Sequence, residues 1–94
     1  MNCSEVRFSA HAVTRAFQRG LSEEEIFQVI TDGEMIADYP DDTPYPSRLI
    51  LGYAHARPIH VVPAQEPNSR VCFVVTAYQP DSNLWSETFR NRRN

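Results

Sequence analysis

The sequence contains no lysine, and all nine of its basic residues are arginine. It has no apolar run near the ~18 residues that a membrane-spanning helix needs, so we expect no membrane partner. Its two cysteines, Cys3 and Cys72, are too few for a disulfide framework or a zinc site, and we expect Cys3 to be a thiol at a loose terminus and Cys72 to be a core residue. The first residues, MNCSE, lack the basic and apolar regions of a signal peptide, which predicts a cytoplasmic location. Nothing in the sequence calls for a metal or a cofactor.

What is present describes one small globular domain. The 94 residues are 41% hydrophobic and 22% charged, which is ordinary for a folded chain. A chain of this length buries one modest core, so we expect a single domain over residues 1–94.

Charge is distributed unevenly along the chain. Residues 22–42 hold eight of the twelve acids and no arginine, whereas the remainder has nine arginines against four acids. Arginine presents a planar fork that matches phosphate geometry. The pattern predicts an acidic surface and a separate phosphate-binding surface, although a merely polarised surface explains it as well.

Periodicity predicts two helices and then a sheet. Ser9 is placed to cap a first helix that ends before Gly20, and Ser22 opens a second helix, with Glu25 completing a capping box, that ends at Gly33. Strands are expected over 35–39, 48–53, 59–62 and 71–78. The predicted fold class is α+β: two N-terminal helices followed by a four-stranded, mainly antiparallel sheet, with a short C-terminal helix or a tail docked by Trp85.

One candidate binding group lies on the first helix. His11, Arg15 and Arg19 recur at i, i+4 and i+8 and share one stripe of that helix, where they could hold phosphates or partner acids, or simply face solvent. Arg48 and the tail residues Arg90, Arg92 and Arg93 are further candidates for RNA contact.

A second group suggests catalysis without a metal. His60 lies in an otherwise apolar strand, and alternation places it on the face away from the helices. Arg57 at the strand entrance and Tyr78 on the next strand could reach the same surface. His60 would transfer protons, Arg57 would stabilise the transition state, and Tyr78 would orient or protonate. The alternative is a structural histidine bonded to a backbone carbonyl.

Much of the chain resembles a bacterial family, domain of unknown function 4258. The matching segments, in chain order, are FSAHA at 8–12 with Arg15, QRGLS at 18–22, YPDD at 39–42, PYPSRL at 44–49, RPIHVV at 57–62, VTAY at 75–78, and Trp85 with Arg92. Ala56 departs from the glycine usual before the arginine. The resemblance implies a relation to the RelE/ParE-like toxins, with their compact fold of two helices and four strands.

The resemblance also implies a function and partners. We expect a toxin of a bacterial toxin–antitoxin pair that acts as a metal-free endoribonuclease on mRNA, free or on the ribosome. Its partner would be a small antitoxin of zinc-finger or helix-turn-helix type. Two alternatives stay open: a non-enzymatic protein-binding module, and a gyrase-directed, ParE-like toxin.

Overall fold

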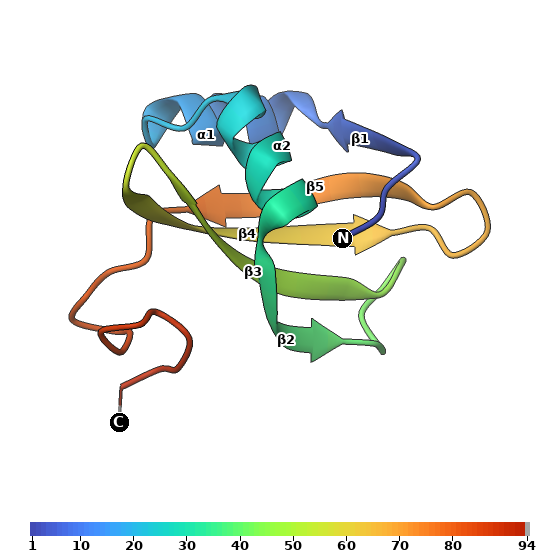
Figure 1. The fold of residues 1–94 in the computed structure, drawn as a ribbon. Helices are drawn as coiled ribbons and strands as arrows, with labels where there is room; N and C mark the ends of the chain where they lie inside the picture. The colour runs from blue at the N-terminus through green and yellow to red at the C-terminus, as the bar shows by residue number, and fades with distance from the viewer. Residues whose placement is uncertain (94) are drawn as a thin grey trace.

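The computed structural model describes residues 1–93 and shows a five-stranded sheet with two helices packed on one face (Figure 1). The elements in chain order are β1 (Glu5–Phe8), α1 (Ala10–Gln18), α2 (Glu23–Asp32), β2 (Glu34–Tyr39), β3 (Ser47–Ala54), β4 (Arg57–Gln65) and β5 (Val71–Tyr78). No helix within the described residues is long and apolar enough to cross a membrane.

The expected fold, with two N-terminal helices and four strands, is wrong in one main respect. A strand, β1, precedes the helices and pairs parallel with β5, so the sheet is mixed and has the order β1-β5-β4-β3-β2. The other neighbouring strands pair antiparallel. Because β1 has only four residues and its partner lies at the far end of the chain, local periodicity could not reveal it.

Both helices begin where their capping residues predicted. The Ser9 side chain accepts a hydrogen bond from the Ala12 backbone, and Ser22 and Glu25 form a reciprocal capping box. Gly33 ends α2 and leads directly into β2. A Cβ atom at Gly33 would collide with the Val29 carbonyl and the Ile50 side chain, so the helix can approach the sheet closely only with glycine there.

The sheet has two buried faces of different character. The helix side carries the main core, in which Ile26, Val29 and Ile30 of α2 pack with Ile59 and Val61 of β4. On the other side, Leu51, His60 and Tyr78 form a row across β3, β4 and β5, as their pairing shows. Leu51 and His60 are buried although no helix covers this face.

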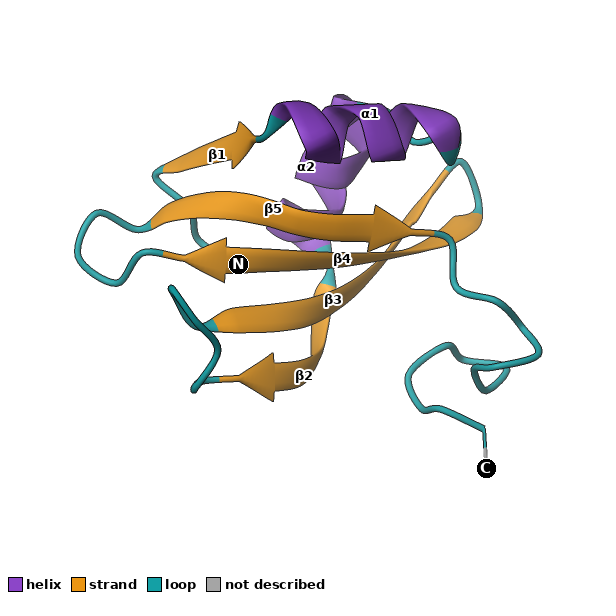
Figure 2. Cartoon of the chain, turned by 180° about the vertical axis from the view of Figure 1, so that it is seen from behind, coloured by secondary structure: helices purple, strands orange, loops and turns teal. Residues whose placement is uncertain are grey.

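The C-terminal segment covers this second face as an ordered tail. No helix forms between Pro80 and Arg93, and the chain folds back so that Trp85 bridges to Arg92. Figure 2 shows the tail leaving β5 and lying on the side of the sheet away from the helices. Among residues 81–93 only Trp85 is buried. The docking role expected for Trp85 is confirmed, and the alternative of a helix is not.

The prediction of a loose terminal thiol at Cys3 is also wrong, whereas Cys72 is buried, as predicted for a core residue. Cys3 and Cys72 form a disulfide that ties the segment before β1 to β5, across a sequence separation of 69 residues. The parallel pairing of β1 with β5, which sets Val6 opposite Cys72, brings the N-terminus close enough for this bond. Without β1, nothing in the sequence indicated that the two cysteines lie together.

Candidate functional site

His60 lies on the face of the sheet away from the helices, as alternation predicted, but it is fully buried, at 0% exposure. Its Nε2 lies 2.9 Å from the Phe89 carbonyl oxygen, and its Nδ1 lies 3.2 Å from the Tyr78 hydroxyl. The Trp85 indole meets the imidazole in a T-shaped contact, with 4.4 Å between ring centroids. The tail therefore encloses the side chain predicted to be the proton carrier.

These contacts fix the tautomer of the neutral ring. A carbonyl can only accept, so Nε2 carries the proton and donates to Phe89, and Nδ1 accepts from the Tyr78 hydroxyl. Burial lowers the pKa of His60, and the hydrogen bond to Phe89 opposes this shift only in part. Both ring nitrogens are therefore engaged within the fold.

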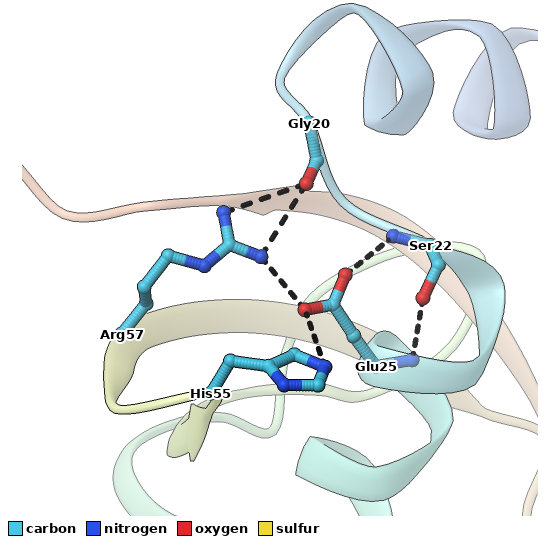
Figure 3. Close-up of polar contacts among 5 residues, drawn as sticks. All are labelled: Gly20, Ser22, Glu25, His55 and Arg57. Carbon is cyan, nitrogen blue, oxygen red and sulfur yellow. Dashed lines mark hydrogen bonds and ion pairs between the residues drawn. The ribbon is translucent and has the colours of Figure 1, made fainter.

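Arg57 occupies a different place from the one expected. Figure 3 shows its guanidinium between the Gly20 carbonyl and Glu25, at the corner where α1 meets α2. Nη2 donates to the Glu25 carboxylate at 2.7 Å. A hydrogen bond from the Ser22 backbone is the main cause of the lowered pKa of Glu25, and Arg57 adds to it against the opposing effect of burial. The exposed His55 approaches the same carboxylate at 3.8 Å.

The structure therefore does not bring Arg57 and His60 together. They lie three residues apart on β4, and an odd spacing on a strand puts two side chains on opposite faces. Arg57 shares the helix side with Ile59 and Val61, whereas His60 shares the tail side with Tyr78. The expectation that Arg57 reaches the surface of His60 is corrected. Of the predicted catalytic group, only His60 and Tyr78 are in contact.

Most of the other predicted RNA-contacting arginines have local partners. Arg48 lies 3.9 Å from Asp38, and Arg90 forms two hydrogen bonds with Glu34. The Arg92 guanidinium lies over the Trp85 ring, 5.5 Å from its centroid, and Arg93 donates to the Ser82 carbonyl. All four guanidinium groups are thus engaged by neighbouring groups of the protein.

The predicted stripe on α1, in contrast, lines a cleft. His11, Arg15 and Arg19 face Val75, Thr76 and Ala77 of β5 across a cavity of about 260 Å³. The cleft exists because β1 pairs with β5 only as far as Val74, after which the chain turns into α1 and leaves the edge of β5 without a neighbouring strand. A bulge at Val75, between the residues paired with Val62 and Pro63, marks the same point.

The cleft is positively charged and contains no acid. Neither α1 nor the lining residues include Asp or Glu. Within residues 1–93, no ion pair involves Arg15 or Arg19. Arg19 donates to the Ala77 carbonyl at 2.9 Å and to the Thr76 hydroxyl at 3.2 Å, which holds its guanidinium at the cleft wall. Two guanidinium forks, a hydroxyl and an imidazole thus surround a space suited to an anion.

Sequence reasoning missed some of these groups. Glu25 was interpreted mainly as part of a helix start, and the odd spacing of Arg57 and His60 could have placed Arg57 on the helix side, where Glu25 lies. Val75 carried no signal, because its position at a bulge depends on where β1 ends. The uncovered edge of β5 follows from β1, which was itself not predicted.

A family model, rather than a single known protein, matches this chain. No curated protein and no solved structure matches the chain significantly. One family model, described as Domain of unknown function (DUF4258), matches residues 8–79, which is more than half of the chain. The match takes in α1, all of the cleft and the row that contains His60, and it ends just before the tail. The chain therefore belongs to the DUF4258 family.

Proposed function

We propose that this protein is an RNA-binding domain that holds the phosphate backbone in the cleft between α1 and β5. The observation that carries the proposal is the convergence of His11, Arg15 and Arg19 on one cavity that has no acidic lining residue. Two guanidinium groups one helical turn apart can each form paired hydrogen bonds with phosphate oxygens.

The lining favours phosphate over a protein partner. Protein interfaces have an apolar centre, whereas Ala12, Val75 and Ala77 are the only apolar residues around this cleft. The exposed apolar residues of α1, Val13 and Phe17, are not among the cleft residues. A phosphodiester alone does not distinguish RNA from DNA, and the choice of RNA rests on the resemblance to RelE/ParE-like toxins.

The distribution of charge over the molecule also favours RNA binding at the cleft. The acid-rich segment 22–42 ends with β2 and the loop after it, at the edge of the sheet opposite to β1 and β5. A polyanion would therefore be repelled from the β2 edge and attracted to the cleft. This explains how a chain with a net charge of −3 can still bind RNA.

Replacing Arg15 and Arg19 together with glutamine is expected to weaken RNA binding and to reduce its salt dependence. If each arginine neutralises one phosphate, the slope of log K against log salt should fall in magnitude by about 1.4 for single-stranded RNA. Fluorescence anisotropy of a labelled oligonucleotide at several salt concentrations measures both quantities. Arg15→Gln alone is the cleaner single variant, because Arg19 also holds the Ala77 carbonyl.

The matched control is Arg70→Asn. It removes an exposed charge from the turn between β4 and β5, outside the cleft, and asparagine tolerates the positive φ of 62° at this position. The control should keep the wild-type slope, apart from a small general electrostatic effect. An equal loss in the control and the double variant would contradict the cleft as the binding site.

RNA cleavage is a second candidate, favoured by the contact between His60 and Tyr78 on the face of the sheet that also carries Thr76. Cleavage there requires the tail to move, because His60 is enclosed. Expression under tight induction, with RNA ends mapped beside His60→Ala, tests it. New ends that the variant loses would support the toxin hypothesis and its small antitoxin partner. Growth arrest without new ends would favour the gyrase-directed alternative, and normal growth a non-enzymatic binding module.

A further inference from the structure

The tail places an aromatic ring and a carbonyl oxygen on His60 at once. Trp85 supplies the ring, in its T-shaped contact, and Phe89 supplies the oxygen that accepts from Nε2. The guanidinium of Arg92, another residue of the tail, lies over the indole ring. Single-stranded RNA is recognised by the same chemistry, because unstacked bases pack on aromatic and guanidinium groups while their edges form hydrogen bonds.

We propose that the surface of His60 and Tyr78 is a binding slot for a nucleobase that carries a ring carbonyl, as uracil, guanine and cytosine do and adenine does not, and that Trp85 fills this slot in the absence of RNA. Such a base combines an aromatic ring, which Trp85 supplies in the tail, with a carbonyl oxygen, which Phe89 supplies. The inference rests on the proposed RNA binding in the α1–β5 cleft, and it assigns the base recognition that phosphate contacts alone do not provide.

The slot is continuous with the cleft. Thr76, which accepts from Arg19 in the cleft, and Tyr78, which contacts His60, are two residues apart on β5 and so lie on one face, about 7 Å apart. Burial raises the pKa of Tyr78, the charge of Tyr39 adds to this shift, and the charges of Arg92 and Arg19 oppose it. A nucleotide whose phosphate lies at Arg19 therefore has its base near the slot.

The tail is attached in a way that permits release. Its polar links to the sheet are the hydrogen bond from His60 to Phe89 and the ion pair of Arg90 with Glu34. Both side chains of that pair are about half exposed, at 46% and 52%, and an exposed pair contributes little to stability. Phe89 has a φ of 60°, which is unfavourable for a bulky residue. The matched family segment also ends at residue 79, before the tail.

The fluorescence of Trp85 tests the proposal directly, because it is the only tryptophan in the chain. Titrating the full-length protein with a short oligouridylate should move its emission to longer wavelength, as the indole leaves its buried site for water. An abasic ribose-phosphate oligomer of equal length is the matched ligand. It should bind in the cleft, with lower affinity, and leave the emission unchanged.

The possible results distinguish the nucleobase slot from the proposed RNA binding in the cleft. Binding of oligouridylate, detected by anisotropy of a labelled oligomer, without a change in Trp85 emission would overturn the slot and leave RNA binding intact. Equal emission changes with both oligomers would also overturn it, because no base would then be involved. Failure of both oligomers to bind would overturn the proposed function and the slot with it.

A variant gives an independent test. Trp85→Ala should increase the affinity for oligouridylate roughly five- to tenfold, because the tail no longer competes, without changing the affinity for the abasic oligomer. Trp85→Phe should restore most of the competition. If Trp85 has only a structural role, Trp85→Ala should weaken binding of both oligomers alike, and thermal unfolding shows whether the variant is folded.

Discussion

Removing the Cys3–Cys72 disulfide is expected to lower the free energy of unfolding by up to about 4 kcal/mol at 25 °C, as chain entropy gives for a closed loop of this size. The bond joins residues 69 positions apart, so the loop that it closes contains 70 of the 94 residues of the unfolded chain. In a domain of this size, the loss would be a large part of the total stability. Urea unfolding of Cys3→Ser, compared with the oxidised wild type, measures it.

The wild-type protein with and without reductant provides the control. Reduced wild type should match Cys3→Ser, and the stability of Cys3→Ser should not respond to reductant. Other contacts still hold the N-terminus: the pairing of β1, hydrogen bonds of Ser4 and Asn2, the terminal amine bound to the Ile30 carbonyl, and apolar side chains packed on the core. Identical unfolding midpoints for the oxidised and reduced protein would contradict the prediction.

The disulfide also bears on location. Such bonds persist mainly in oxidising environments, and the cytoplasmic location stays a prediction from the sequence. That prediction depended on the composition of the first residues and on an assignment of Cys3 to a loose terminus.

Local signals in the sequence were sufficient to predict where the two helices begin. Ser9, Ser22 and Glu25 cap them through contacts that span no more than three residues, so the pattern contains all the necessary information. The pairing of β1 with β5 is different, because it joins residues more than 60 positions apart and gives no periodic signal. The mixed sheet, the disulfide and the uncovered edge of β5 all follow from this one pairing and were missed together.

In the candidate site, too, local features were predicted correctly and features that depend on distant contacts were not. The spacing of His11, Arg15 and Arg19 placed them correctly on one side of α1, but the cleft wall they face depends on where β1 stops. Alternation also placed His60 on the correct face, yet applying it to Arg57 would have put the two on opposite faces. The burial of His60 could not be predicted, because the tail that covers it has no regular secondary structure.

Replacing His60 with alanine is expected to destabilise the fold by about 3 kcal/mol, since it leaves a cavity and removes the partners of two polar groups. The affected groups are the Tyr78 hydroxyl and the Phe89 carbonyl. Tyr78→Phe is the matched control, because it removes only one of these hydrogen bonds and should cost about 1 kcal/mol. Denaturant unfolding at neutral pH compares the two variants with wild type.

The same side chain should make stability depend on pH. The pKa of His60 is lowered in the fold, so the unfolded chain binds a proton more readily. The contribution of neutral His60 is therefore fully present above its unfolded pKa of about 6.5 and is lost as the pH falls below that value. The groups around the ring are Tyr78, the Trp85 indole and the Phe89 carbonyl, with Arg92 nearby, and none of them is an acid that would stabilise the charged form.

His60→Leu separates the titration from the loss of volume. Unfolding measured from about pH 7.5 to about pH 5.5 should show wild type losing more stability than the leucine variant, and the difference reports His60 because the exposed His11 and His55 are present in both proteins. An equal slope in the two proteins would mean that His60 is not buried as a neutral ring. A smaller slope in the leucine variant would show that the buried, neutral His60 ring is a source of the pH dependence, as its burial and its hydrogen bond to Phe89 imply.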